Sequence, residues 1–200
     1  MTTDKIRIEP LRKKEIPNAA ILLSESMCTN PNHLAIFKTV DATAMAVQKK
    51  MFLMVLNNKK NTAFSAKLND QIVGIMVYTS SKNCQIKPWK LIWEFPKLIA
   101  IFRHSLFRVL NWRMTWSKHD SAVPHIHFGP IAVAGAYQGK GIGRVMLTYF
   151  CDYLDRSKQL GYLETDKAEN VLIYEKFGFK VTSEDEIYNV ANWFMHRYPK

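Results

Sequence analysis

The stretch Ile131–Arg144, IAVAGAYQGKGIGR, decides the fold that we expect. It begins as an apolar strand ending at Val133, passes through a turn of small residues, and enters a helical pattern at Ile142. Glycines at such a junction let backbone N–H groups converge without obstruction by Cβ atoms. The free amides of the first helical turn and the helix dipole together favour a bound anion. We therefore predict a phosphate site at this junction.

Two common phosphate motifs do not fit the spacing. A Walker A loop needs four residues between its first glycine and Gly-Lys, and then Ser or Thr. Gly135 leaves three residues before Gly139, and Gly141 follows the lysine. The dinucleotide fingerprint requires a glycine where Arg144 stands. What remains is Q-x-x-G-x-G between a strand and a helix.

Composition indicates one soluble globular domain over residues 1–200, because 48% of the residues are hydrophobic and 22% are charged. The charged N-terminus does not resemble a signal peptide, so we expect none. Arg103 and Arg108 interrupt the longest apolar run, so we also predict no transmembrane segment. Cys28, Cys84 and Cys151 are scattered and odd in number. This usage predicts reduced thiols in the cytoplasm and argues against a disulfide or zinc framework.

The net charge of +11 favours an anionic partner: a polyphosphate cofactor, nucleic acid or a membrane surface. Charge alone does not rank these partners. About half of the excess positive charge lies between Ser81 and Asp120, a segment with eight Lys or Arg and only two acidic residues. Four of the five tryptophans are in the same segment. We define residues 82–119 as a basic, tryptophan-rich helical insert, with one helix expected over LIAIFRHSLFRVLNW.

Hydrophobic periodicity predicts a mixed α/β (α+β) chain. Before the insert we expect a strand over residues 6–10, helices over 13–27 and 41–57, a break at Asn30-Pro31-Asn32, and a hairpin of 62–68 with 71–79 turning at Asn69-Asp70. After it we expect a strand over 125–133, bulged or splayed at Gly129-Pro130. A helix over 142–161, a strand over 162–165, a helix over 170–177 and strands over 179–182 and 188–197 follow.

Two motifs together resemble one family. Gln138, Gly141 and Gly143 resemble the acetyl-CoA pyrophosphate loop of GCN5-related N-acetyltransferases (GNAT). Residues 162–179, YLETDKAENVLIYEKFGF, resemble the second cofactor motif of that superfamily. The strand HIHFGPIAV and the ending WFMHR are similar to the puromycin-acetyltransferase-like subgroup, strongly over residues 125–197 and weakly before them. Gly135 departs from the family's usual proline.

The resemblance implies a fold and a set of site residues. The fold is a mixed, mostly antiparallel central sheet, splayed at the acetyl-CoA site and flanked by helices. Main-chain groups near Ile131 and Val133 would pair with the pantetheine arm, loop amides would cradle the pyrophosphate, and Tyr174 would protonate the departing thiolate. The implied cofactor-binding residues are Ile131, Ala132, Val133, Gln138, Gly139, Lys140, Gly141, Ile142, Gly143, Arg144, Asn170 and Tyr174.

Amide formation also needs a group that removes a proton from the attacking amine. Glu164 and His127 are the candidates, and each could instead be a structural residue that is hydrogen-bonded in the core. His125 and His127 share a strand face and could form a metal pair, but the sequence shows no further clustered ligands beside them. We therefore predict no metal.

The expected function is transfer of the acetyl group from acetyl-CoA to a primary amine by direct attack. The rival is a non-catalytic CoA-binding or nucleic-acid-binding module on the same fold, although no nucleic-acid motif is present. A protein N-terminus, a lysine, a polyamine and an aminonucleoside are all compatible acceptors, and the subgroup resemblance favours a small amine. The insert either covers the acceptor site, packs on the sheet or lies on a membrane surface. The chain could act as a monomer or a dimer.

Overall fold

Seven strands form one sheet in the computed structural model, which describes residues 6–84 and 88–200. The strand order is β1-β2-β3-β4-β5-β7-β6, and only the β4–β5 pair is parallel. This confirms the predicted mixed, mostly antiparallel sheet. The strands are β1 (Arg7–Pro10), β2 (Asn61–Leu68), β3 (Gln71–Ser80), β4 (His125–Val133), β5 (Leu160–Thr165), β6 (Lys180–Ile187) and β7 (Val190–Arg197).

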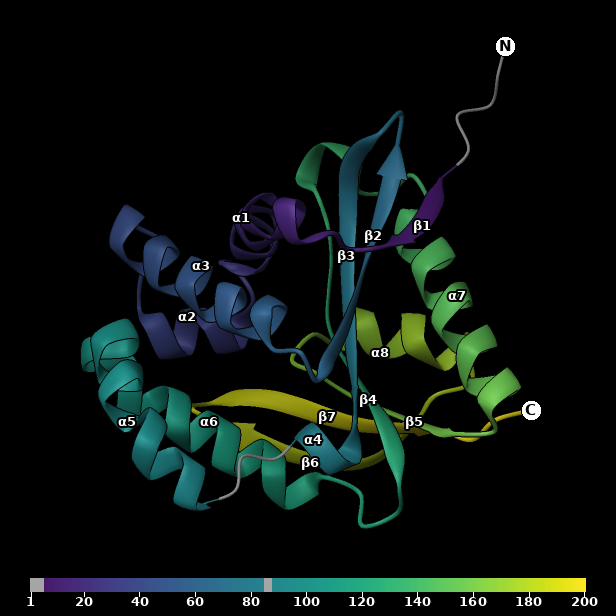
Figure 1. Ribbon diagram of the computed structural model, residues 1–200. Coiled ribbons are helices and arrows are strands. Elements are labelled where there is room, and N and C mark those ends of the chain that lie inside the picture. Colours follow the sequence, from purple (N-terminus) through teal and green to yellow (C-terminus); the bar gives the residue numbers. More distant parts are fainter. Residues whose placement is uncertain (1–5, 85–87) are drawn as a thin grey trace.

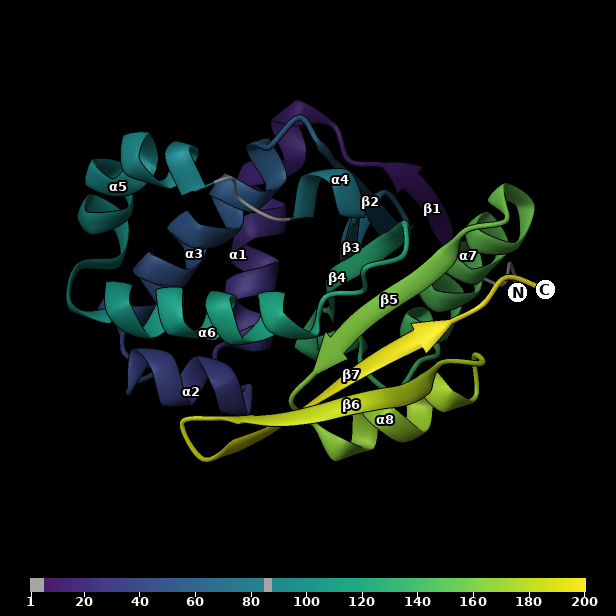
Figure 2. The ribbon, with the colours of Figure 1, turned by 90° about the horizontal axis from the view of Figure 1, so that it is seen from below.

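Helices cover both faces of the sheet (Figures 1 and 2). On one face, α1 (Ile16–Met27) and α3 (Ala42–Asn57) bury a cluster that includes Ile75 and Val77 of β3. On the other face, α7 (Ile142–Ser157) packs on Ile126 and Phe128 of β4, and the same cluster extends to α8 (Ala168–Glu175). The remaining α-helices are α2 (Pro31–Phe37), α4 (Ser81–Cys84), α5 (Pro88–Phe102) and α6 (Leu106–His119).

The N-terminal half follows the predicted pattern with one omission. The hairpin turns at Asn69 and Asp70, whose φ angles of 49° and 62° are those of a tight primed turn. A short helix, α2, begins within the predicted break at Asn30-Pro31-Asn32, because Pro31 is its first residue. Proline favours a first helical position, where its missing N–H costs nothing. The break was therefore predicted, but the short helix that follows it was not.

The basic insert contains two long helices, so the single predicted helix is wrong. A 3-10 turn, Arg103–Ser105, separates α5 from α6, and Arg103 has a φ of 49°. Both helices pack mainly on α2 and α3, beside the sheet (Figure 2). Their buried residues share one cluster with Ile36, Phe37, Ala44, Val47 and Ile187. Of the four tryptophans in the insert, Trp89 has a side chain that lies outside the described part of the chain.

Strand β4 is bulged where Gly129-Pro130 predicted it. Met76 pairs with Ile131 and Tyr78 with Phe128, so two residues of β4 stand opposite Val77 alone. No helix in the described ranges 6–84 and 88–200 is both long and apolar enough to cross a membrane.

A buried arginine connects three elements near the C-terminal end of α7. Arg197 at the end of β7 donates to both carboxylate oxygens of Asp155 on α7, at 2.8 and 2.7 Å. Its Nε also donates to the carbonyl of Phe177, just after α8, at 2.8 Å. The hydrogen bonds from Arg197 lower the pKa of Asp155 to about 2. Removing one partner of such a pair leaves the other charge buried and uncompensated.

We expect Asp155→Asn to lower the free energy of unfolding by about 3 kcal/mol at neutral pH. Because the folded-state pKa of Asp155 is depressed, its contribution is present above the unfolded value of roughly 4 and is lost as pH falls towards about 2. Urea unfolding at several pH values tests this. The difference from the wild type should shrink in acid, and the exposed neighbour Asp152→Asn should change stability little. An equal loss in both variants would contradict the assignment.

Candidate active site

The two central strands separate at one point of the sheet. β4 and β5 pair through His125, Ile126 and His127, and the last pair joins His127 to Tyr162. Beyond it β4 continues to Val133 with only β3 beside it in the sheet. The strand order therefore opens a gap along the second half of β4.

Backbone groups of this half-strand face the gap. The N–H of Ala134 donates to Val73 on β3 at 2.9 Å, so peptide groups of the same parity point towards β3. Those of Ile131 and Val133 consequently point away from it. The carbonyl of Val133 already accepts from Ser26 Oγ at 3.2 Å and from Gln138 Nε2 at 3.1 Å. The N–H of Val133 and both groups of Ile131 are thus presented towards the gap.

The glycine-rich junction joins β4 to α7 through a 3-10 turn, Gly135–Tyr137. Gly139 and Gly141 have φ angles of 75° and 79°, which side chains rarely tolerate. A Cβ atom at either position would meet nothing within 4 Å, so the backbone angle, and not crowding, requires glycine. Gly141 is the N-cap of the 16-residue α7, and it has no side chain with which to cap the first-turn amides. These amides lie at the end of the gap and are chemically suited to an anion.

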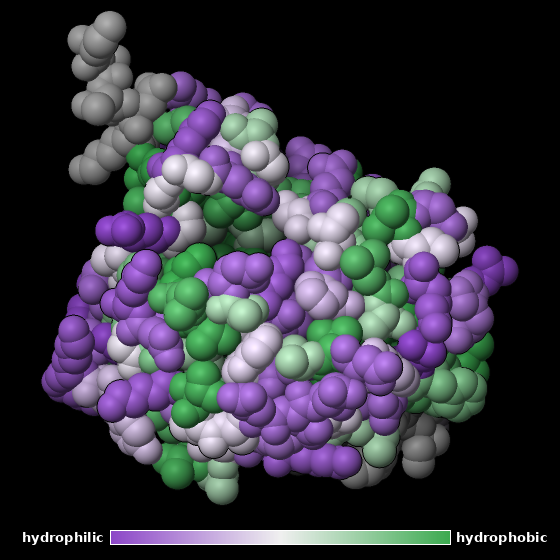
Figure 3. Space-filling view, turned by 180° about the vertical axis from the view of Figure 1, so that it is seen from behind, coloured by the Kyte–Doolittle hydropathy of each residue, from purple (hydrophilic) through white to green (hydrophobic). Residues whose placement is uncertain are grey.

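Two adjoining cavities of about 570 and 330 Å³ follow the gap. They share Ile131, Ala132, Val133, Gly143, Asn170 and Ile173. Arg144 and Lys176 line the larger cavity and Lys167 the smaller, and neither lining includes Asp or Glu. The lining is therefore electropositive and suits a polyanion. Figure 3 shows the molecule from behind, with a hollow whose walls are partly hydrophobic.

Helix α8 contributes two side chains to these cavities. Asn170 lines both of them, and its amide donates to Thr165 Oγ1 at 3.2 Å, which fixes it to the end of β5. Tyr174, one turn later, lines the larger cavity and is 7% exposed. Burial raises the pKa of the Tyr174 phenol well above its usual value. The hydroxyl therefore keeps its proton at neutral pH and can donate it within the cavity.

Glu164 and His127 do not line either cavity, but they contact each other. Glu164 Oε2 and His127 Nε2 are 2.8 Å apart, and the glutamate side chain is 3% exposed. The pair bridges β4 and β5 where the strands separate: His127 occupies the last register position, and Glu164 lies two residues beyond its register partner Tyr162. The pair therefore lies at the closed end of the gap. The ring of Tyr162 packs edge-on against the His127 imidazole, with the ring centres 5.2 Å apart.

Most of the predicted cofactor-binding residues meet at the two cavities. Lys140 is the exception, because its ammonium lies 5.0 Å from the ring centre of Tyr137 and it does not line either cavity. Sequence reasoning missed Ser26, Thr165, Lys167 and Lys176. Ser26 comes from a helix more than 100 residues away, and only the folded chain brings it to Val133.

Beside the Glu164–His127 pair, Cys84 and Asp120 lie close to His125 and His127. Sequence spacing did not indicate this gathering, because residues 85–119 separate the first two members. The strand alternation did place both histidines on one face, opposite Ile126 and Phe128, and the structure confirms that arrangement.

Known proteins share this arrangement of strands and helices. Residues 109–181 match the family model of the acetyltransferase (GNAT) domain. A protein described as histone acetyltransferase HPA2 and related acetyltransferase, from Corynebacterium glutamicum, has a TM-score of 0.74 at 15% identity, covering 98% of this chain and 97% of its own. Arylalkylamine N-acetyltransferase 2 from Aedes aegypti has a TM-score of 0.74 at 14% identity, covering 98% of this chain and 100% of its own.

A third solved structure extends the comparison. The ribosomal-protein-S18-alanine N-acetyltransferase from Escherichia coli has a TM-score of 0.60 at 14% identity, covering 97% of this chain and 94% of its own. At these identities the solved structures show a shared fold. The match to the acetyltransferase (GNAT) domain covers residues 109–181, and the solved structures share the fold of nearly the whole chain.

Proposed function

We propose that the protein is an N-acetyltransferase that moves the acetyl group of acetyl-CoA directly to a primary amine. One observation carries the proposal: an electropositive path leads from the amides of α7 to the Tyr174 hydroxyl along the unpaired half of β4. The amides of α7 suit the phosphates of the cofactor, and the unpaired half of β4 suits its extended, amide-bearing arm. The Tyr174 hydroxyl suits the thiolate leaving group. Acetyl-CoA has all three of these groups, which supports it as the donor.

The chain's residues divide the work as follows. The amides at Gly141–Arg144, with Arg144, Lys167 and Lys176, bind the pyrophosphate end. Peptide groups of Ile131 and Val133 orient the pantetheine arm and stabilise the carbonyl oxygen as the amine attacks. The new C–N bond forms as the C–S bond breaks, and Tyr174 gives its proton to the sulfur. No cysteine is required as a nucleophile: Cys151 is buried on α7, and burial raises the pKa of its thiol to about 11.

The Glu164–His127 pair is our proposed route for the proton of the amine, either directly or through water. We expect Glu164→Gln to reduce kcat/KM roughly 100-fold, the usual worth of a positioned base. His127→Gln should reduce kcat/KM less than Glu164→Gln does if Glu164 is the base, and more if the His127 imidazole is the base. Steady-state kinetics of both variants, with unchanged acetyl-CoA binding as the control, decide between them. Near-normal rates in both would remove the pair from the mechanism.

The acceptor that we favour is a small primary amine. The likeness of residues 125–197 to the puromycin-acetyltransferase-like subgroup supports it, as does the fold shared with an arylalkylamine N-acetyltransferase. Release of CoA thiol should be measured with arylalkylamines, polyamines, an aminonucleoside and peptides with free N-termini. A small amine should give the highest kcat/KM. If only peptides were acetylated, the proposed small-amine acceptor would be wrong, but the proposed acetyl transfer would still hold.

The rival function, a non-catalytic module on the same fold, is tested by the same assay. A CoA-binding module would bind acetyl-CoA and release no thiol with any amine. A nucleic-acid-binding module would bind oligonucleotides with a strong salt dependence and show no turnover.

The free state of Cys28, Cys84 and Cys151 is consistent with the reducing cytoplasm in which we propose that the enzyme works.

A further inference from the structure

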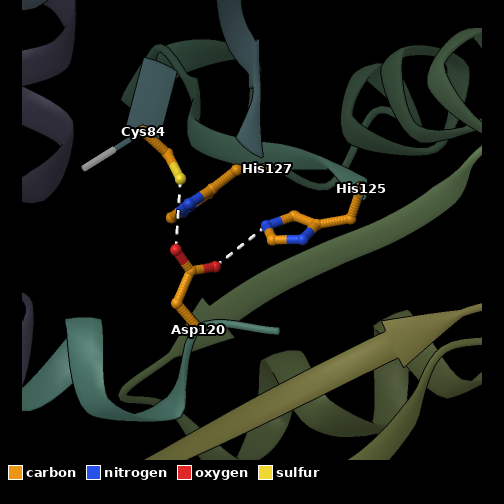
Figure 4. Close-up of side chains that lie close together, drawn as sticks. All are labelled: Cys84, Asp120, His125 and His127. Atoms are coloured by element: carbon orange, nitrogen blue, oxygen red, sulfur yellow. Dashed lines mark hydrogen bonds and ion pairs between the residues drawn. The ribbon is translucent and has the colours of Figure 1, made fainter. Parts of the chain in front are cut away.

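Four side chains with metal-binding chemistry gather at the start of β4 (Figure 4). Cys84 is the last residue of α4, Asp120 follows the last residue of α6, and His125 and His127 extend from the same face of β4. Each offers one ligand atom, and these atoms all lie within 4.8 Å of one another. Neither Cys84 nor Asp120 is part of the proposed acetyl-transfer machinery.

Both imidazoles are oriented as metal ligands usually are. A histidine that binds a metal through one nitrogen commonly hydrogen-bonds through the other to a carbonyl or carboxylate. His125 Nδ1 is 2.8 Å from the carbonyl of Val123, which turns Nε2 towards Asp120 at 2.9 Å. His127 Nε2 is held by Glu164 at 2.8 Å, which leaves Nδ1 available.

A network of hydrogen bonds alone does not account for the cluster. The Cys84 thiol lies 3.2 Å from Asp120 Oδ2 and 3.1 Å from the carbonyl of Ser81, so these groups contact each other. The Nδ1 atom of His127, however, is buried and has no hydrogen-bond partner. An unsatisfied buried nitrogen is costly, and a bound cation would satisfy it.

We propose that Cys84, Asp120, His125 and His127 bind a zinc ion. One sulfur, two imidazole nitrogens and one carboxylate oxygen are all donor types that zinc accepts in a tetrahedral site. Zinc bonds of about 2.0–2.3 Å hold donor atoms roughly 3.3–3.8 Å apart. On binding, the most distant donors would therefore move about 1 Å closer, and the 2.9 Å contact between His125 and Asp120 would lengthen. The Cys84 thiol loses its proton to solvent as the zinc–sulfur bond forms.

The position of the cluster suggests what the zinc does. Cys84 lies four residues before the first residue of α5 and Asp120 directly follows α6, whereas both histidines belong to the central sheet. One ion would therefore clamp both ends of the insert to β4. It would also take His127 out of proton transfer and leave Glu164 as the base, because His127 Nδ1 would be coordinated and Nε2 would donate to Glu164.

Cobalt titration of the reduced, chelator-stripped protein tests the site without using activity. Co²⁺ should bind at one equivalent and give the visible bands of tetrahedral cobalt together with a near-ultraviolet sulfur-to-cobalt band, both of which zinc should displace. Cys84→Ser should abolish the sulfur band, and Asp120→Asn should retain it with at least tenfold weaker binding. Cys28→Ser is the matched control, since its thiol bonds a carbonyl three residues earlier at 3.2 Å, as Cys84 does.

Two results would overturn the proposal. One is that neither metal binds at stoichiometric, micromolar concentrations to the folded wild-type protein. The other is that Cys84→Ser and Asp120→Asn both bind Co²⁺ with the affinity and spectrum of the wild type, or that Cys28→Ser loses the sulfur-to-cobalt band as Cys84→Ser does. Because binding is the readout, these failures are distinguishable from failure of the proposed acetyl transfer.

Discussion

Tyr174→Phe should lower kcat roughly 10²–10³-fold while leaving the KM for acetyl-CoA close to that of the wild type. The substitution removes only the hydroxyl of a side chain that is 7% exposed and lines the larger cavity. Because burial raises the pKa of this phenol, its proton is present throughout the neutral range. The loss should therefore fall on the step in which the thiolate departs and not on binding. Thiol release under saturating acetyl-CoA measures it.

Tyr153→Phe is the matched control. Tyr153 lies on α7, stacks on Tyr78 with ring centres 5.0 Å apart, and does not line either cavity. It should lose neither kcat nor affinity. If both variants keep the wild-type rate, the proton of the leaving group comes from another source. If Tyr174→Phe loses the same factor in kcat with a far weaker acetyl-CoA complex, the residue acts in binding.

Gly141→Asp should weaken acetyl-CoA binding about 100-fold or more. Gly141 is the N-cap of α7, and the anion site begins at its amides. A carboxylate placed roughly 4–6 Å from the pyrophosphate costs about 3–4 kcal/mol at an effective dielectric constant near 20. Each 1.4 kcal/mol is about tenfold in affinity. Isothermal calorimetry with CoA at moderate salt measures the effect.

Gly141→Asn separates charge from backbone strain. The residue has a φ of 79°, and asparagine tolerates that conformation about as well as aspartate does. The amide has nearly the same size without the charge. We expect Gly141→Asn to lose less than tenfold in affinity, and high salt to narrow the gap between the two variants. Equal losses in both would mean that the loop's shape, and not the anion at α7, dominates binding.

The sequence predicted the glycine-rich part of the candidate site because its signals are local. A strand, glycines with positive φ and a helix start must be consecutive to form an anion site, so IAVAGAYQGKGIGR contains nearly all of it. Asn170 and Tyr174 are four residues apart on one helix, and their common face follows from helical periodicity. The Gly129-Pro130 bulge was predictable for the same reason, since proline cannot donate a ladder hydrogen bond.

The parts that the sequence did not predict depend on long-range contacts. Ser26 reaches Val133 from α1, and Cys84 reaches Asp120 across the whole insert. The insert's two helices bury their apolar faces on α2 and α3, a helix-on-helix contact that amphipathic spacing cannot distinguish from packing on a sheet. The break between them at Arg103 has no glycine or proline at that residue to announce it.

Incubation with labelled acetyl-CoA, followed by intact-protein mass spectrometry and analysis of the amine, tests the central claim most directly. Direct attack predicts that the protein's mass stays unchanged when acetyl-CoA is present alone, and that adding an accepted amine produces the labelled amide together with free CoA thiol in equal amounts. An acetylated enzyme that forms before the amine is added would contradict direct attack. Tight acetyl-CoA binding with no amide from any class of amine would contradict the transferase itself.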